Sequence, residues 1–113
     1  MSRFVTLGLA LPLLVSAASA HAVNDGDVSL QRQRELTQLI KHDCGSCHGL
    51  TLQGGLGPAL TPQALQDRVP GHLARVISEG RNGTAMPPWG ELLTTAEVEW
   101  IVQILLAGVP NNE

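Results

Sequence analysis

The stretch HDCGSCHG, residues 42–49, contains both cysteines of the chain, Cys44 and Cys47, and two of its four histidines, His42 and His48. Three chemistries use two cysteines at this spacing: a reversible disulfide, one half of a zinc site, and the covalent attachment of haem. Each of the three needs different residues elsewhere in the chain. The rest of the sequence therefore decides between them.

The sequence lacks a feature that each of the disulfide and zinc interpretations requires. A redox-active Cys-x-x-Cys motif begins a helix, because the helix N-terminus lowers the pKa of the leading thiol. Here the motif follows a predicted helix and precedes a glycine-rich loop. A closed zinc site needs four ligands, usually in two paired clusters. Cys44, Cys47 and one neighbouring histidine supply three, and His72 is the only histidine that follows them.

Haem attachment accounts for the whole motif. In Cys-x-x-Cys-His the two thiols form thioether bonds with the haem, and the adjacent histidine, here His48, reaches the iron. Both cysteines are then used, so neither needs a further partner. His42 is too close to the attachment site to reach the opposite face of the haem, and we expect it to be exposed.

A second iron ligand distinguishes an electron carrier from a protein with an open iron site. Met86 is the expected ligand, because it lies in the proline-rich loop GTAMPPW and is the only methionine after Met1. A methionine opposite a histidine raises the reduction potential of the iron. His72 is the alternative ligand, at the start of a predicted helix.

The first 20 residues have the pattern of a secretory signal peptide. Arg3 supplies a positive charge, residues 4–15 are almost all apolar, and Ala18-Ser19-Ala20 matches the cleavage pattern. A helix that crosses a bilayer needs about 20 apolar residues, and this apolar run is shorter. The alternative interpretation is an uncleaved membrane anchor. We expect cleavage after Ala20, export to the periplasm, and no stable membrane insertion.

Cleavage would leave a flexible leader over residues 21–28 and one small domain over residues 29–113. The remaining chain has six Lys and Arg residues and ten Asp and Glu residues, which gives a net charge of −4. No basic cluster is present, which argues against nucleic acid as a partner. Trp89 and Trp100 are the only aromatic residues left, so large side chains are few for a domain of this size. A bound cofactor is expected to fill its centre.

Hydrophobic periodicity predicts an all-α fold of three or four helices. Ser29 is the expected N-cap of the first helix, which should end near His42 and place Cys44 and Cys47 just past its end. Residues 49–60 and 81–90 are then two long loops, and loops of this length are usually functional.

Three further helices are predicted from start and stop signals. One begins at Thr61-Pro62 and lasts about two turns, and the next follows a chain break at Pro70-Gly71 and ends at Gly80. The last begins at a capping box, Thr94-Thr95-Ala96-Glu97, and reaches about Ala107.

From about Leu36 to Leu106 the sequence resembles the class I cytochromes c. The resemblance is carried by Cys44-Gly45-Ser46-Cys47-His48-Gly49, Gly57-Pro58-Ala59-Leu60, Ile77-x-x-Gly80, Gly83-Thr84-Ala85-Met86-Pro87-Pro88-Trp89 and Leu93-Thr94-x-x-Glu97. It implies a fold of three to four helices around one haem c, attached through Cys44 and Cys47, with His48 and Met86 as iron ligands. It also implies that the Pro58 carbonyl accepts a hydrogen bond from the ring of His48.

Within that family, residues 48–65 and 83–101 are most similar to the small periplasmic cytochromes encoded beside the haem-containing nitrite reductase of denitrifying bacteria. This implies a one-electron carrier, not an enzyme, that serves nitrite reduction and acts as a monomer or weak dimer. Its partners would be redox proteins, among them nitrite reductase. The alternatives are a role in maturing the reductase or its haem, and a sensor or enzyme if Met86 is not a stable ligand.

The chain departs from the family at one helix contact. Its first helix lacks the glycine and aromatic pair that usually packs against an aromatic residue of the last helix. Trp100 is therefore expected to fill that contact alone.

Overall fold

The computed structural model describes residues 26–111, so the expected signal peptide over residues 1–20 lies outside the described range, as does most of the leader. The helices are α1 (Leu30–Leu39), η1 (Ile40–Cys44), α2 (Gly45–His48), α3 (Pro62–Leu65), α4 (Pro70–Glu79) and α5 (Thr95–Ala107). No strand occurs among the described residues, which confirms the all-α prediction. Between residues 26 and 111 no helix is long and apolar enough to cross a bilayer.

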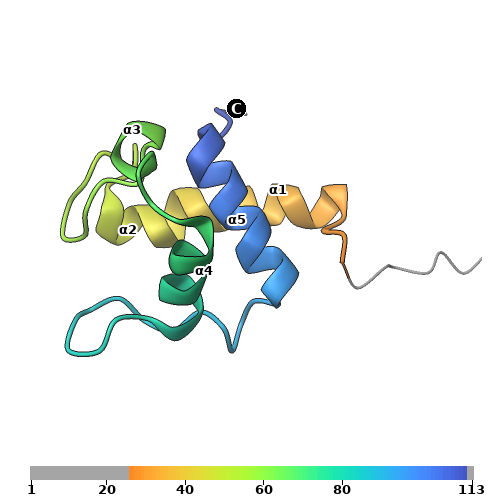
Figure 1. Cartoon of the computed structure of the whole chain (residues 1–113). Helices are drawn as coiled ribbons and strands as arrows, with labels where there is room; N and C mark the ends of the chain where they lie inside the picture. Colours follow the sequence, from red (N-terminus) through yellow and green to blue (C-terminus); the bar gives the residue numbers. More distant parts are fainter. Residues whose placement is uncertain (1–25, 112–113) are drawn as a thin grey trace, which may run out of the picture.

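The elements α1, η1 and α2 form one continuous helical run (Figure 1). The prediction that this helix ends near His42 is therefore wrong, because Cys44 ends η1, a π-helical turn, and Cys47 lies in α2. Gly45 keeps a helical conformation, with φ −61° and ψ −27°, and does not interrupt the run. Gly49 ends it with a φ of 91°, which glycine adopts without strain. Such π-helical turns frequently occur at functional sites.

Side-chain caps begin three helices where the sequence predicts them. Ser29 caps α1 and Thr61 caps α3. At the start of α5 the Thr94 hydroxyl accepts from the N–H of Glu97 (3.2 Å), and the Glu97 carboxylate accepts from the N–H of Thr94 (2.8 Å). The predicted chain break at Pro70 is wrong, since Pro70 is the first residue of α4. A proline is tolerated there because the first helical N–H has no partner within the helix.

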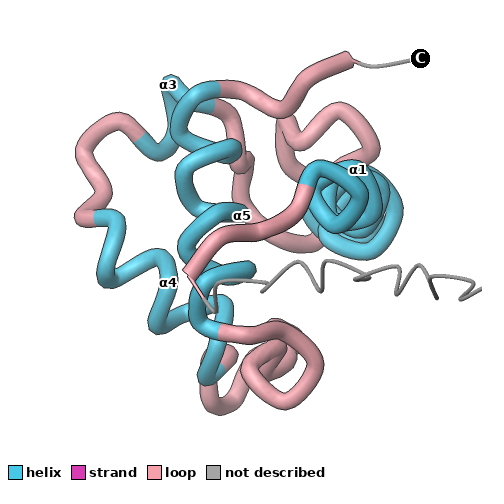
Figure 2. Tube along the Cα trace, turned by 90° about the vertical axis from the view of Figure 1, so that its right-hand side faces the viewer, coloured by secondary structure: helices cyan, strands magenta, loops and turns pink. Residues whose placement is uncertain are grey.

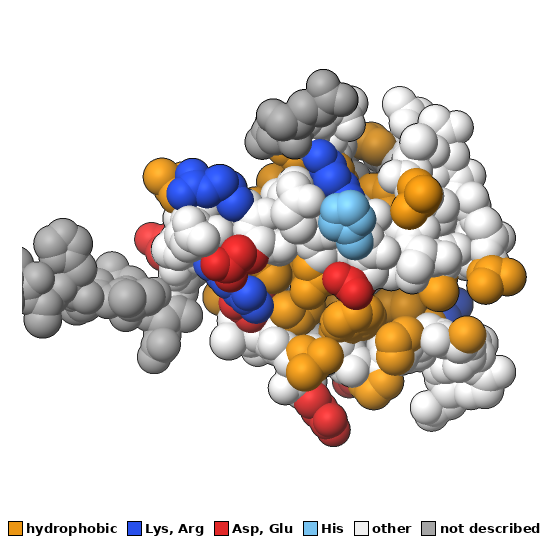
Figure 3. Space-filling view, turned by 180° about the vertical axis from the view of Figure 1, so that it is seen from behind, with side chains coloured by type: hydrophobic (Ala, Val, Ile, Leu, Met, Phe, Trp, Pro, Cys, Tyr) orange, Lys and Arg blue, Asp and Glu red, His pale blue; other side chains and the backbone are white. Residues whose placement is uncertain are grey.

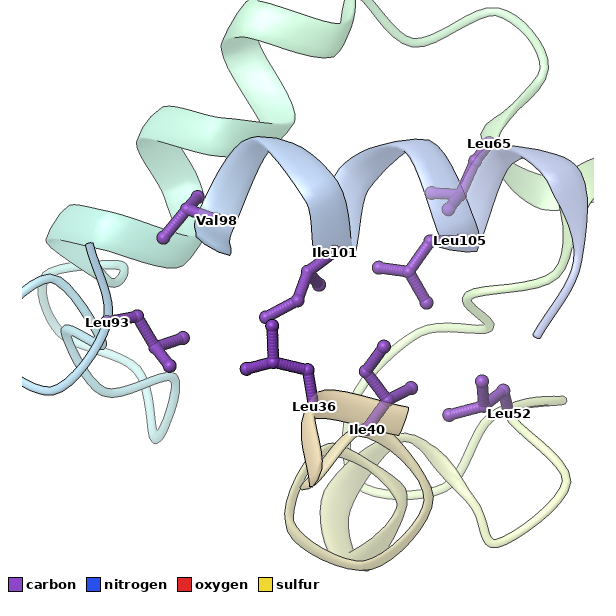
Figure 4. Packing of buried hydrophobic residues seen from close by; sticks show 8 residues of the cluster. All are labelled: Leu36, Ile40, Leu52, Leu65, Leu93, Val98, Ile101 and Leu105. Carbon is purple, nitrogen blue, oxygen red and sulfur yellow. The ribbon is translucent and has the colours of Figure 1, made fainter. Parts of the chain in front are cut away.

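The core lies where the helical run crosses α5. Figure 2 looks along α1, with α4 and α5 running across the view, and α4 packs against α5. Leu36 and Ile40 are fully buried and point toward Ile101 and Leu105 of α5 (Figure 4). Trp100 stays half-buried beside this core. The prediction that Trp100 alone fills the crossing is wrong, because branched aliphatic side chains fill it.

An ion pair joins the crossing helices at the edge of the core. The Arg32 guanidinium of α1 donates to the Glu97 carboxylate of α5, which also accepts from the backbone N–H of Thr94. These bonds, the one from Arg32 above all, hold the pKa of Glu97 below its ordinary value. One side chain thus caps α5 and links α5 to α1.

We expect Glu97→Gln to lower the free energy of unfolding by about 0.5–1 kcal/mol at pH 7, because it removes the charge that Arg32 pairs with and keeps an acceptor for the cap. The pKa of Glu97 is lower in the folded than in the unfolded chain. Its carboxylate therefore stabilises the fold above the unfolded-state pKa, and this contribution is lost as the pH falls through the folded-state pKa. Urea denaturation over a pH series should show the two proteins converging in acid.

Glu99→Gln is the control for this measurement, since Glu99 is an exposed carboxylate on the same helix. It should change the stability little at any pH. A difference between Glu97→Gln and the parent that stayed constant down to acid pH would contradict the ion-pair account.

Candidate functional site

A cleft of about 680 Å³ lies between the helical run, α4 and the two long loops. Its volume is within the range of about 300–1,000 Å³ that small-molecule and cofactor pockets occupy. The four residues singled out in the sequence, Cys44, Cys47, His48 and Met86, all line it. Folding therefore brings together residues from a helix and from a loop that lies 38 positions further along the chain.

Cys44 and Cys47 form no disulfide and lie at partly buried positions. Burial raises the pKa of the Cys44 thiol to about 11, and the negative charge of Asp43 adds to the shift. Thiols of disulfide-exchange proteins have the opposite shift, a lowered pKa. Within residues 26–111 no three His, Cys, Asp or Glu side chains are placed to hold a metal ion, so the described chain does not assemble the ligands of the zinc alternative.

His48 ends α2, and the first loop orients its ring. The Nδ1 atom lies 2.7 Å from the carbonyl oxygen of Pro58, as the resemblance implies. A carbonyl oxygen only accepts, so Nδ1 carries the proton in this contact. The Nε2 atom then keeps its lone pair, which is the form in which a neutral imidazole binds a metal.

The first loop is tied to the end of α2 through its backbone. The N–H of Gly54 donates to the carbonyl of His48, and the N–H of Gly57 donates to the carbonyl of Cys47, both at 2.8 Å. These bonds satisfy carbonyl groups that the helix end leaves free. A Cβ at Gly57 would lie 2.7 Å from both Cε1 and Nδ1 of His48. Only glycine therefore lets the loop backbone approach the imidazole ring this closely.

Met86 lies in the second loop, which folds back onto the C-terminal end of α4. The N–H of Trp89 donates to the carbonyl of Ile77 at 2.9 Å. Gly80, with a φ of 69°, permits the return of the loop, since a Cβ there would lie 2.7 Å from the carbonyl oxygen of Met86. The side chain of Met86 is partly buried, whereas His72, which also lines the cleft, is exposed.

The helix α4 shows most directly that something large belongs in the cleft. It has no buried residue, although Leu73, Val76 and Ile77 form an apolar stripe along it. All three line the cleft. An apolar stripe of this kind normally faces a core, and in α4 it faces the cleft, so the cleft suits a large apolar group.

The residues present fit a covalently bound haem. The two thiols stand beside an imidazole with a free Nε2, and a thioether sulfur lines the same cleft. The apolar stripe of α4 suits the porphyrin plane. Arg68 and Arg81 also line the cleft and suit the two propionate groups of haem.

Comparison with known proteins agrees with this chemistry. A family model described as "Cytochrome C oxidase, cbb3-type, subunit III" matches residues 31–104. The chain belongs to the c-type cytochrome family, whose members carry covalently bound haem c.

Two of the similar proteins match this chain over nearly their whole length. The chain is 44% identical over 110 residues to cytochrome c55X of Stutzerimonas stutzeri, which covers 92% of this chain and 89% of that protein. The solved structure of the c-type cytochrome NirC superimposes with a TM-score of 0.71 and 46% identity, covering 74% of this chain and 100% of that chain.

A third relative is a larger protein. The chain is 31% identical over 106 residues to dihydro-heme d1 dehydrogenase of Pseudomonas aeruginosa, covering 94% of this chain but 20% of that protein. The likeness is therefore to one part of the dehydrogenase.

Sequence reasoning assigned roles to the residues with reactive side chains, whereas Gly57 and Gly80 appeared only as parts of motifs and as turn or helix-end signals. In the sequence both glycines look like ordinary turn or helix-end signals. Their importance depends on what lies opposite them in space, the His48 ring for Gly57 and the Met86 carbonyl for Gly80. The Gly-Pro pair at residues 57–58 is the sequence signal that could have indicated the role of Gly57.

We expect Gly57→Ala to lower the free energy of unfolding of the haem-bound protein by about 1–3 kcal/mol, because the added methyl group would press on the His48 ring and weaken its bond to Pro58. Gly71→Ala is the matched control, since a Cβ at Gly71 in α4 meets nothing within 4 Å. It should be neutral or slightly stabilising, as alanine is the better helix former. Urea denaturation measures both, and equal unfolding midpoints for the two variants would contradict the close approach.

Proposed function

We propose that the protein is a periplasmic one-electron carrier, exported by a signal peptide that is cleaved after Ala20. Its haem c would be attached through Cys44 and Cys47, with His48 and Met86 as iron ligands. Bound haem supplies an iron that changes its charge by one electron. The observation that carries the proposal is that His48 and Met86, from separate elements, line one cleft of cofactor size. With His48 and Met86 both holding the iron, no position would be left for a substrate, which favours electron transfer over catalysis.

The chain's own residues are arranged to keep both ligands in place. Pro58 orients the ring of His48 through the 2.7 Å contact. Backbone bonds to the end of α4 hold the loop that carries Met86. Ligands that stay in place in both oxidation states need little rearrangement when an electron arrives or leaves.

The rim of the cleft offers a surface for brief contacts with redox proteins. Leu56 lines the cleft and is 92% exposed. In Figure 3 charged side chains gather over the half of the face nearer the start of α1, whereas hydrophobic side chains spread over the other half. Weak electron-transfer complexes bury small areas, below about 1,200 Å². A haem-containing nitrite reductase of denitrification is the partner that we propose, on the similarity of the loop sequences.

Replacing Met86 tests the ligand assignment. Met86→Leu should keep the covalent haem and most of the apolar volume but remove the sulfur. The weak near-infrared sulfur-to-iron band should disappear from the oxidised protein, and the reduction potential should fall. His72→Ala is the control from the same cleft and should keep the band. A band that persists in Met86→Leu, or is lost in His72→Ala, would contradict the assignment.

The attachment of the haem is tested by removing both thiols. Cys44→Ser combined with Cys47→Ser should abolish covalent attachment, because a serine hydroxyl does not form the thioether bonds. The haem should then separate from the polypeptide on a denaturing gel, where the parent protein keeps it. Each single variant should retain one bond and therefore some haem stain. Full stain in the double variant would refute attachment at these cysteines.

The similarity to part of dihydro-heme d1 dehydrogenase favours a second candidate function, electron exchange during maturation of the reductase or of its haem. Both functions would use the same haem domain, so partner kinetics must separate them. Stopped-flow mixing would pair the reduced protein with oxidised nitrite reductase, and the oxidised protein with the dehydrogenase and its dihydro-haem substrate. Faster transfer to the reductase supports the first function, and faster reduction by the dehydrogenase supports the second.

A further inference from the structure

Thr84 connects two parts of the loop that carries Met86. Its hydroxyl donates to the carbonyl of Arg81 at 2.8 Å and accepts from the backbone N–H of Met86 at 3.3 Å. The same turn is closed by backbone bonds from the N–H of Arg81 to the carbonyl of Met86 and from the N–H of Thr84 to the carbonyl of Arg81, both 3.2 Å. The Thr84 side chain therefore bridges the start and the end of the turn over residues 81–86.

The rest of this turn has little support from neighbouring elements. Residues 81–85 are all exposed, Arg81, Thr84 and Ala85 on the side that lines the cleft, and a Cβ at Gly83 would meet nothing within 4 Å. The flanking backbone bonds, from Gly80 to Val76 and from Trp89 to Ile77, hold the ends of the loop on α4. Between those anchors the backbone of Met86 is held by hydrogen bonds inside the turn.

We propose that the Thr84 hydroxyl is a latch that positions Met86 and sets how readily the Met86 sulfur leaves the haem iron. The inference rests on Met86 being the iron ligand, as proposed above. Withdrawal of Met86 with its backbone requires the N–H of Met86 and the carbonyl of Arg81 to part from the hydroxyl. Thr84 is thus a positioning residue that acts through the backbone of Met86.

The latch requires a hydroxyl group and not the methyl group of threonine. Valine has nearly the same shape and neither donates nor accepts, whereas serine keeps both hydrogen bonds. Loss of two neutral, exposed hydrogen bonds should raise the population of the released state by about five- to tenfold. This separates the latch from a simple packing role, in which valine would replace threonine without effect.

Imidazole competition against the oxidised, haem-bound protein measures the release of Met86. The sulfur-to-iron band reports the fraction of protein in which Met86 is still bound. Thr84→Val should lose the band at an imidazole concentration about five- to tenfold below that of the parent, and Thr84→Ser within about twofold of it. Thr51→Val is the matched control, since Thr51 is an exposed threonine in the other long loop, and it should match the parent.

The outcomes distinguish the latch from the ligand assignment. A parent protein without the sulfur band would refute ligation by Met86, and the latch with it. A parent with the band and a Thr84→Val variant displaced at the parent's concentration would leave ligation intact and overturn the latch. Equal weakening by valine and serine would also overturn it. Urea denaturation checks that each variant is folded, and Thr84→Ala replaces Thr84→Val if valine prevents folding.

Discussion

The hydrogen bond between Nδ1 of His48 and the carbonyl of Pro58 is the constraint on which the site depends. It leaves Nε2 free for a metal, and it can form only if the loop after α2 turns back on the helix that precedes it. That return requires a backbone without a side chain at Gly57, beside the ring, and a positive φ at Gly49, where the helix ends. Two glycines of this loop are thus linked to fixing one imidazole ring.

The second constraint is the small number of buried apolar side chains. The buried side chains are aliphatic and concentrate where α1 and η1 cross α5, as with Leu36, Ile40 and Ile101. The helix α4 contributes no buried residue, and its apolar stripe borders a cleft of about 680 Å³. A domain of this size has little surplus stability. Haem in the cleft would complete the core, so the cofactor that carries out the chemistry also acts as the largest hydrophobic group of the fold.

The two proposed iron ligands are held in different ways. His48 is part of a helical run and lies one position from Cys47, and its ring is anchored by Pro58. Met86 is carried by a loop whose turn is exposed and is bridged by the Thr84 hydroxyl. In the proposed coordination, the Met86 side is therefore the one that the loop can adjust. An electron carrier needs Met86 to stay bound to the iron, whereas a protein that binds a small ligand needs Met86 to leave it. In the proposal above, the loop over residues 81–86 decides between the two behaviours.

The sequence by itself determined the chemistry of the site and the starts of three helices. Local patterns can be recognised in a sequence without knowledge of the fold. They are the motif around Cys44 and Cys47, the loop methionine Met86, and the caps at Ser29, Thr61 and Thr94. Only the tertiary structure decided that the first helix runs on through a π-helical turn to His48 and that aliphatic residues, not Trp100, fill the helix crossing. It also decided that Gly57 and Gly80 make room for the segments that carry His48 and Met86. These features depend on which backbone lies opposite which side chain across the cleft, and such distances between remote segments are set by packing and leave no periodic trace in the sequence.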